Sequence, residues 1–107
     1  MEIKSSFSMH IDYVFYQWGI FVIGQVKNGS IKVGDKVKVL GHNSELDNLC
    51  ISLKKYEHGF AQLADKDVVS RMQVSEAKEG DYVCIGLLQG SKLQIRSGMI
   101  LVSRDQN

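Results

Sequence analysis

The side chains best suited to surface chemistry are aromatic, amide and cationic, and the most informative of them is the only tryptophan. Trp18 follows Tyr16 and Gln17 and precedes Gly19, where we expect a loop or the end of a strand. An indole at such a site can stack on a nucleic-acid base or fill a pocket in a protein partner. The alternative is a packing role, in which the ring closes one end of the core. We predict that Trp18 is at least partly exposed and forms a binding face with Tyr16 and Gln17.

Lysines crowd the stretch that follows and are suited to contact phosphate oxygens. They are Lys27, Lys32, Lys36 and Lys38. Val37 and Val39 alternate with Lys36 and Lys38, so one face of that strand is apolar and the other is cationic. Lys36 and Lys38 are therefore candidate binding residues. The alternative is that these lysines form a solvated face that guards the edge of a sheet.

No arrangement of nucleophile, base and acid in the sequence predicts an enzyme. The chain has no G-x-S-x-G turn and no cysteine and histidine in a recognised catalytic pattern. His10, His42 and His58 lack the spacing of metal ligands. Cys50 and Cys84 lie in separate apolar runs, which predicts two reduced core thiols rather than a zinc or redox site. We expect no catalytic activity, no metal and no cofactor.

Glycines at turn positions indicate how the chain positions these groups. Asn28-Gly29 predicts a hairpin, because a type I′ turn needs positive φ at both central residues and these two residues tolerate it. Gly34-Asp35 marks a second turn shortly afterwards. Glycine can take a positive φ there, and aspartate can accept hydrogen bonds from nearby backbone amides. The pattern predicts tightly turned β-structure.

Short segments with strand patterns recur between turn signals along the chain. They lie at residues 3–15, 20–26, 36–40, 49–56, 68–74, 82–88 and 99–102. Short strands at this spacing are typical of a β-barrel or a β-sandwich, and no segment has convincing helical periodicity. We expect residues 57–67 to form a loop and residues 1–107 to form one all-β domain.

Composition agrees with a globular protein and says little about a partner. Hydrophobic residues make up 44% of the chain and charged residues 23%, both near globular averages. The net charge of +1 means that any contact with nucleic acid must be local. The N-terminus lacks the apolar core of a signal peptide, and no apolar run is long enough to span a membrane. We expect a cytoplasmic protein that does not bind membranes.

Three ordered motifs resemble the second domain of translational GTPases such as elongation factor Tu. They occupy residues 21–37, 77–85 and 95–101 and include Val33-Gly34-Asp35, Glu79-Gly80-Asp81 and Ser97-Gly98-Met99. The resemblance covers nearly the whole chain. It implies a closed antiparallel β-barrel of the translation-factor domain 2 type, here as a stand-alone chain without a GTPase domain. The expected structural turns are Gly29, Gly34, Gly80 and Gly98.

The motifs that bind GTP in that family are missing from this chain. There is no Gly-Lys dipeptide, hence no phosphate-binding loop, and no Asn-Lys-x-Asp motif to read guanine. We therefore expect no binding of GTP.

The resemblance also implies a contact surface, because the family's barrel helps to hold the aminoacyl end of tRNA and touches the ribosome. Two positions differ from the family pattern. Trp18 stands where the family often has arginine, and Gln73 aligns with a glutamate that lines the pocket for the terminal adenosine. We expect a non-catalytic binding module whose partner is a protein or an RNA related to tRNA or the ribosome. The alternative is a structural or self-associating subunit, a homo-oligomer with no nucleic-acid role.

Overall fold

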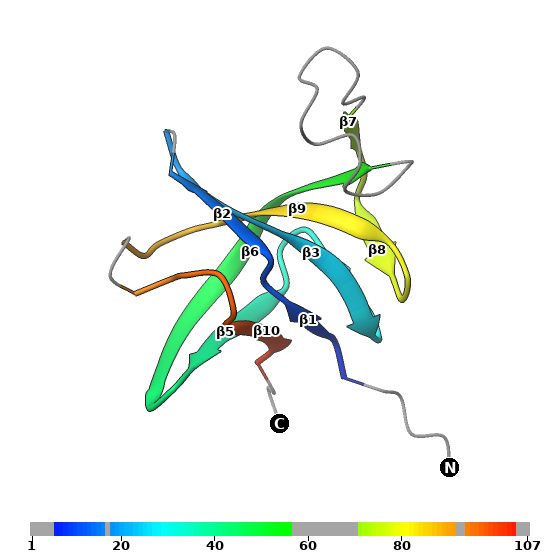
Figure 1. Ribbon diagram of the computed structural model, residues 1–107. Helices are drawn as coiled ribbons and strands as arrows, with labels where there is room; N and C mark the ends of the chain where they lie inside the picture. The colour runs from blue at the N-terminus through cyan, green and yellow to red at the C-terminus, as the bar shows by residue number, and fades with distance from the viewer. Residues whose placement is uncertain (1–5, 17, 57–70, 92–93, 105–107) are drawn as a thin grey trace.

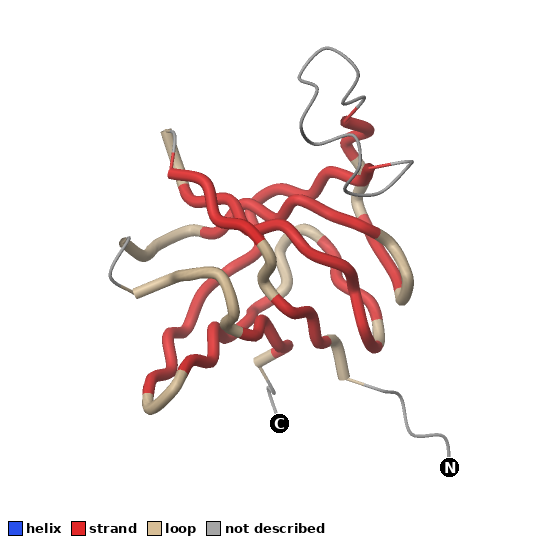
Figure 2. Tube along the Cα trace, viewed as in Figure 1, coloured by secondary structure: helices blue, strands red, loops and turns tan. Residues whose placement is uncertain are grey.

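The computed structural model describes residues 6–16, 18–56, 71–91 and 94–104. Strands and no helix occur in these ranges (Figure 2). Gln17 and the expected loop at 57–67 lie outside the described residues, so both predictions stay predictions. The strands are β1 (Ser8–His10), β2 (Tyr13–Tyr16), β3 (Ile20–Asn28), β4 (Ser30–Lys32), β5 (Lys36–Gly41), β6 (Ser44–Tyr56), β7 (Arg71–Gln73), β8 (Glu76–Lys78), β9 (Tyr82–Leu87) and β10 (Ile100–Ser103).

Six strands form a closed antiparallel barrel, which confirms the predicted fold class (Figure 1). Their order around the ring is β1, β10, β5, β6, β9 and β3, and β3 pairs with β1 to close it. β2 continues beside β3, and β7 pairs with β6. β4 and β8 pair only with each other, in a small second sheet. Closure pairs most strand edges, which explains how the fold avoids exposed edges without a single proline.

Alternate side chains of the strands fill the barrel, as the two-residue period of a strand requires. Val37 and Val39 of β5 point inward and are buried, while Lys36 between the turn and Val37 is exposed. β3 and β9 depart from this alternation, because Ile23 and Cys84 on the opposite face of these strands are also buried, in a second and smaller cluster. Further buried core residues are Met9, Val22, Val26, Leu53, Val83, Ile85 and Leu101.

Gly24 permits the close approach of two strands where the barrel closes. A Cβ atom at this position would overlap the backbone carbonyl oxygen of His10 and would also crowd Met9. Because a backbone carbonyl cannot rotate away as a flexible side chain can, only glycine fits between β1 and β3. The glycine is therefore required by the barrel closure and not by a turn.

Two turns with the same hydrogen bonds lead from the small sheet into the barrel. The Asp35 carboxylate accepts a bond from the backbone N–H of Lys32 at 2.8 Å, and the Asp81 carboxylate accepts one from Lys78 at 3.0 Å. Gly34 and Gly80 have φ angles of 100° and 95°. The predicted positive φ of these glycines is confirmed, as it is for Gly29 (68°) and Gly98 (93°).

The hairpin predicted at Asn28-Gly29 is wrong. β3 and β4 do not pair with each other, because β3 pairs with β1, β2 and β9 while β4 pairs with β8. Gly29 has a positive φ, but Asn28 does not, so the turn is not of type I′. The glycine instead lets the chain leave the barrel wall and enter the small sheet, where Ile31 is buried.

Other strand boundaries differ from the predictions in ways that the pairing explains. The strand expected at 3–15 is interrupted at Ile11 and Asp12, where the chain passes from pairing with β10 to pairing with β3 alone. β6 begins at Ser44, earlier than expected, because it forms a hairpin with β5. Of the strand expected at 68–74, residues 71–73 are a strand and 68–70 lie outside the described residues. The short strands β4 and β8 were not predicted as separate elements.

Cys50 and Cys84 are both buried and neither forms a disulfide, which agrees with the prediction of two core thiols. Burial and the nearby Asp35 carboxylate raise the pKa of the Cys50 thiol to about 11. In the described part of the chain, no helix is long and apolar enough to cross a membrane.

Candidate functional site

Trp18 lies at the tip of the loop that joins β2 to β3. The two strands pair in register up to Tyr16 and Ile20, so the loop between them is short. The side chain of Trp18 is 96% exposed and its φ is 60°. A positive φ is uncommon for a bulky residue, and such strain is found more often at functional sites than elsewhere. The predicted exposure is confirmed, and the role in binding stays a prediction.

Tyr16 supports this loop and does not share its exposure. Its side chain packs against the barrel core, and its hydroxyl donates to the backbone carbonyl oxygens of Ser91 (3.0 Å) and Ile95. Partial burial raises the pKa of the Tyr16 hydroxyl, while the nearby Arg96 guanidinium opposes this shift. The hydroxyl therefore remains a hydrogen-bond donor at neutral pH. Tyr16 therefore supports the start of the Trp18 loop, and its predicted part in a binding face stays a prediction.

Ile95, and not Trp18, closes this end of the core. The packing role considered for the Trp18 ring therefore belongs to Ile95. Its side chain is fully buried within the main core cluster. Gly90 has a φ of 138°, and a Cβ atom there would press on the side chains of Ile95 and Ile20. Glycine at this position leaves room for the Ile95 side chain in the core.

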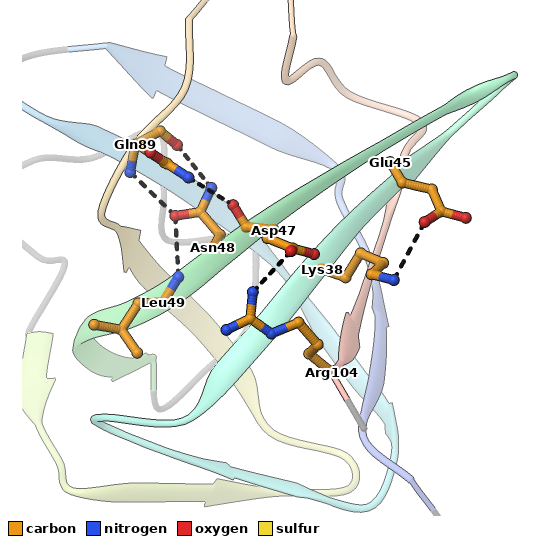
Figure 3. A network of polar contacts seen from close by, with 7 residues as sticks. All are labelled: Lys38, Glu45, Asp47, Asn48, Leu49, Gln89 and Arg104. Carbon is orange, nitrogen blue, oxygen red and sulfur yellow. Dashed lines mark hydrogen bonds and ion pairs between the residues drawn. The ribbon is translucent and has the colours of Figure 1, made fainter. Parts of the chain in front are cut away.

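Asn48 anchors Gln89, which precedes Ile95 in the chain (Figure 3). It is the one buried polar residue among those described, at 4% exposure. Its amide nitrogen donates to the carbonyl oxygen of Gln89 at 2.7 Å, and its amide oxygen accepts from the N–H groups of Gln89 and Leu49, both at 3.1 Å. Such a fully bonded amide is costly to disturb in a dry environment. Asn48 therefore holds Gln89, and the Tyr16 hydroxyl holds residues 91 and 95.

The remaining candidates do not join Trp18. Gln73 of β7 is exposed and pairs with Lys54 of β6. Two more strands follow across the sheet, because Lys54 pairs with Cys84 of β9 and Cys84 pairs with Ile23 of β3. Each strand adds about 4.8 Å, so Gln73 lies several strands from the Trp18 loop. Lys36 and Lys38 lie on β5, separated from β3 by β6 and β9.

The two lysines also differ in their partners. The amino group of Lys38 lies 3.2 Å from the Glu45 carboxylate, across the β5–β6 hairpin. Lys36 is exposed at the start of β5. The candidate residues therefore form separate locations, and the Trp18 loop is the one with an exposed aromatic ring. Among the described residues, no group of three or more histidine, cysteine, aspartate or glutamate side chains is arranged to hold a metal ion.

Two further aromatic rings stand on the outer face of β2. Tyr13 and Phe15 are 52% and 51% exposed, because alternation along β2 turns Val14 and Tyr16 inward. Among the described strands β2 pairs only with β3, so its other edge is an edge of the sheet. This strand is the one place in the described barrel where an exposed edge carries exposed aromatic side chains.

The closed six-stranded barrel and its Gly-Asp turns define a β-barrel of the translation-factor class. Comparison with solved structures agrees. The chain is similar to the translation elongation factor SelB from Methanococcus maripaludis in its apo form, with 30% sequence identity and a TM-score of 0.73. The match covers 98% of this chain and 20% of that protein. Comparison with models of protein families and with curated proteins gave no match. The predicted resemblance to the barrel domain of translation factors is confirmed.

Proposed function

We propose that this barrel is a non-catalytic RNA-binding module of translation and that the Trp18 loop stacks on an unpaired base. The similarity to a translation elongation factor supports a translation-related role, since the match extends over nearly the entire chain. The partner and the stacking contact are the parts of the proposal that go further. Since the chain spans only 20% of the matched factor, the activities of the complete factor are not transferred to it.

One observation carries the proposal, namely the exposure of the only tryptophan on a supported loop. Exposed apolar rings are costly to solvate, and an isolated indole at 96% exposure contributes no packing to the core. Its loop is nevertheless fixed by the Tyr16 hydroxyl on residues 91 and 95. Stacking of such an exposed ring on a base is worth about 1–3 kcal/mol.

Fluorescence of Trp18 tests this proposal directly, because the chain has one tryptophan. Adding a single-stranded RNA of about six nucleotides should quench the emission, within the site sizes typical of such barrels. Trp18→Ala should weaken binding of a labelled RNA by about 5- to 150-fold, which corresponds to the stacking energy. Val33→Ala, at another exposed apolar residue (46% exposed), should leave the affinity unchanged. Unchanged emission with no binding of the labelled RNA would refute the proposal.

A specific observation favours a second candidate, which is self-association through β2. An edge strand with exposed Tyr13 and Phe15 can pair with the same strand of another copy. Sedimentation of the wild type and of Phe15→Lys would reveal this, since a charge on the outer face should abolish a dimer. A monomer at all concentrations would rule out the candidate.

The proposal includes two absences that follow from the sequence. Without a phosphate-binding loop and a guanine-reading motif, the chain should not bind GTP or hydrolyse it. Calorimetry with GTP and magnesium should give no heat of binding, and a saturable isotherm would contradict this. A translation-related role also places the protein in the cytoplasm, which localisation of the tagged chain would test.

A further inference from the structure

A polar groove opens beside the segment that supports Trp18. Its volume is about 560 Å³, and it lies between the β5–β6 turn and residues 94–99. Leu46 and Met99 form its apolar part. Gly41 brings the two walls together, because a Cβ atom there would collide with Met99 and Ser44. The polar side chains that line it are His42, Ser44, Glu45, Gln94, Arg96 and Ser97.

The charge balance of the groove favours an anion. Arg96 is exposed, and it makes no ion pair with another described residue. Glu45 also lines the groove, but its carboxylate is paired with Lys38 at 3.2 Å. The second nearby carboxylate, Asp47, is paired with Arg104 at 2.9 Å. The guanidinium of Arg96 is therefore the charge that these pairs leave uncompensated, and a guanidinium fits a phosphate better than any other side chain.

The backbone that carries Arg96 is fixed by contacts on both sides. Its carbonyl oxygen accepts a bond from the N–H of Met99 at 3.3 Å, and Gly98 donates to the carbonyl oxygen of Ile11 at 2.7 Å. The preceding residue, Ile95, is buried in the barrel. The backbone position of Arg96 is therefore set before a ligand arrives, while its exposed side chain is available to the ligand.

Arg96 is also close to the Trp18 loop. The Tyr16 hydroxyl bonds to the carbonyl oxygen of Ile95, the residue that precedes Arg96. Trp18 is two residues from Tyr16, at most about 7 Å along an extended chain. An RNA strand that places one base on Trp18 can therefore extend a phosphate toward Arg96 within a few nucleotides.

We infer that the groove binds a phosphate group of the RNA strand whose base stacks on Trp18. The Arg96 guanidinium supplies the charged hydrogen bonds, and the hydroxyls of Ser44 and Ser97 supply neutral donors. This inference rests on the proposed function, and it adds the direction in which the strand leaves the tryptophan. The two contacts differ in kind, because stacking is insensitive to salt while a phosphate contact releases counterions.

Salt dependence separates the two contacts. The affinity of a labelled single-stranded RNA of about six nucleotides is measured between about 50 and 200 mM salt for wild type, Arg96→Gln, Lys27→Gln and Trp18→Ala. Each phosphate contact with a single strand adds about 0.7 to the steepness of log affinity against log salt. Arg96→Gln should lose this amount, so the affinity ratio of wild type to variant shrinks about 2.6-fold across the series. Lys27→Gln removes the same charge from the opposite end of β3 and should keep the wild-type slope.

Each outcome has a definite meaning for the inference. A reduced slope for Arg96→Gln, with a wild-type slope for Trp18→Ala at lower affinity, supports the phosphate contact. RNA binding with equal slopes for wild type and Arg96→Gln overturns the inference and leaves the stacking proposal intact. No RNA binding by the wild type overturns the proposed function, and the inference fails with it.

Discussion

The starts of β5 and β9 differ from their ends in how many of the nearby side chains are bonded within the protein. Each strand starts at a Gly-Asp turn, where the Asp35 and Asp81 carboxylates bond backbone amides. β5 ends at the β5–β6 turn, which lines a groove with Arg96, and β9 ends at Leu87, before residues 88–91. In Figure 1 the β2–β3 and β5–β6 tips both lie on the left of the view, and the turn from β8 to β9 lies on the right.

This difference separates residues that build the barrel from residues available to a ligand. At the Gly-Asp end, Gly34 donates to the carbonyl oxygen of Cys50 and Gly80 donates to that of Val26, so the turns are tied to neighbouring strands. At the other end Asn48 bonds to the carbonyl oxygen of Gln89, and the indole of Trp18 and the side chain of Arg96 are exposed. We expect the exposed indole to contact a partner, because it adds no packing to the core and such rings are frequent anchors of binding surfaces.

The largest loss of stability is expected where β3 pairs with β1 and closes the barrel. Gly24→Ala should lower the free energy of unfolding by about 3 kcal/mol, because the new methyl group overlaps the backbone of β1. Chemical denaturation measures the loss. Gly34→Ala is the comparison, since nothing lies within 4 Å of a Cβ atom there and only the strain of its positive φ is added. If Gly24→Ala costs no more than Gly34→Ala, the closure of β1 on β3 is wrong.

A second effect concerns the thiol beside the Gly34 turn. The pKa of Cys50 rises from 9.0 in the unfolded chain to about 11 in the fold. The folded protein then binds the proton more tightly, so its stabilisation is complete below pH 9 and is lost as pH rises toward 11. Two units correspond to roughly 2–3 kcal/mol. The free energy of unfolding, measured by denaturation at each pH, should decline less steeply between pH 9 and 11 for Cys50→Ala than for the wild type. Parallel curves for the two proteins would contradict a buried, neutral thiol.

The two Gly-Asp turns should respond alike to a β-branched residue. Gly34→Val and Gly80→Val should each cost about 2 kcal/mol, because valine is strained at φ near 100° even where space is free. Thermal melting compares both with Lys36→Val, a control at an exposed strand position. An unchanged midpoint for either glycine variant would show that its turn is not as described.

The smallest effect is expected at the exposed end. Trp18→Ala should change the free energy of unfolding by less than about 0.5 kcal/mol, because the ring is almost fully exposed. Trp18→Gly should be about 1 kcal/mol more stable than Trp18→Ala, since glycine takes a φ of 60° without strain. A loss of about 3–5 kcal/mol for Trp18→Ala would instead mark the ring as part of the core.

The sequence predicted the parts of the molecule that depend on local patterns. Alternation of Val37 and Val39 with lysines gave β5, and the Gly-Asp pairs gave both turns into the barrel. The Asn28-Gly29 hairpin failed because a turn signal does not say which strand the next segment joins, and Ile31 is buried by pairing with β8.

The candidate site was predictable only in part. The exposure of Trp18 followed from its neighbours, but the groove combines His42 with Arg96, which are distant in the sequence. Asn48 carried little signal, since it follows Asp47 in the polar first half of β6, and its burial and hydrogen bonds depend on contact with Gln89. Long-range pairing decides which polar residues meet, and one sequence does not encode it in any short pattern.

Chemical-shift mapping tests the contrast between the two ends most directly. Backbone amide signals of the labelled protein are followed while a short single-stranded RNA is added. We predict that shifts concentrate at Trp18, at residues 42–44 and at 94–99, with the signals of Gly34 and Gly80 unchanged. Shifts centred on the Gly-Asp turns, or no shifts at any RNA concentration, would contradict the assignment of the Trp18 end as the binding surface.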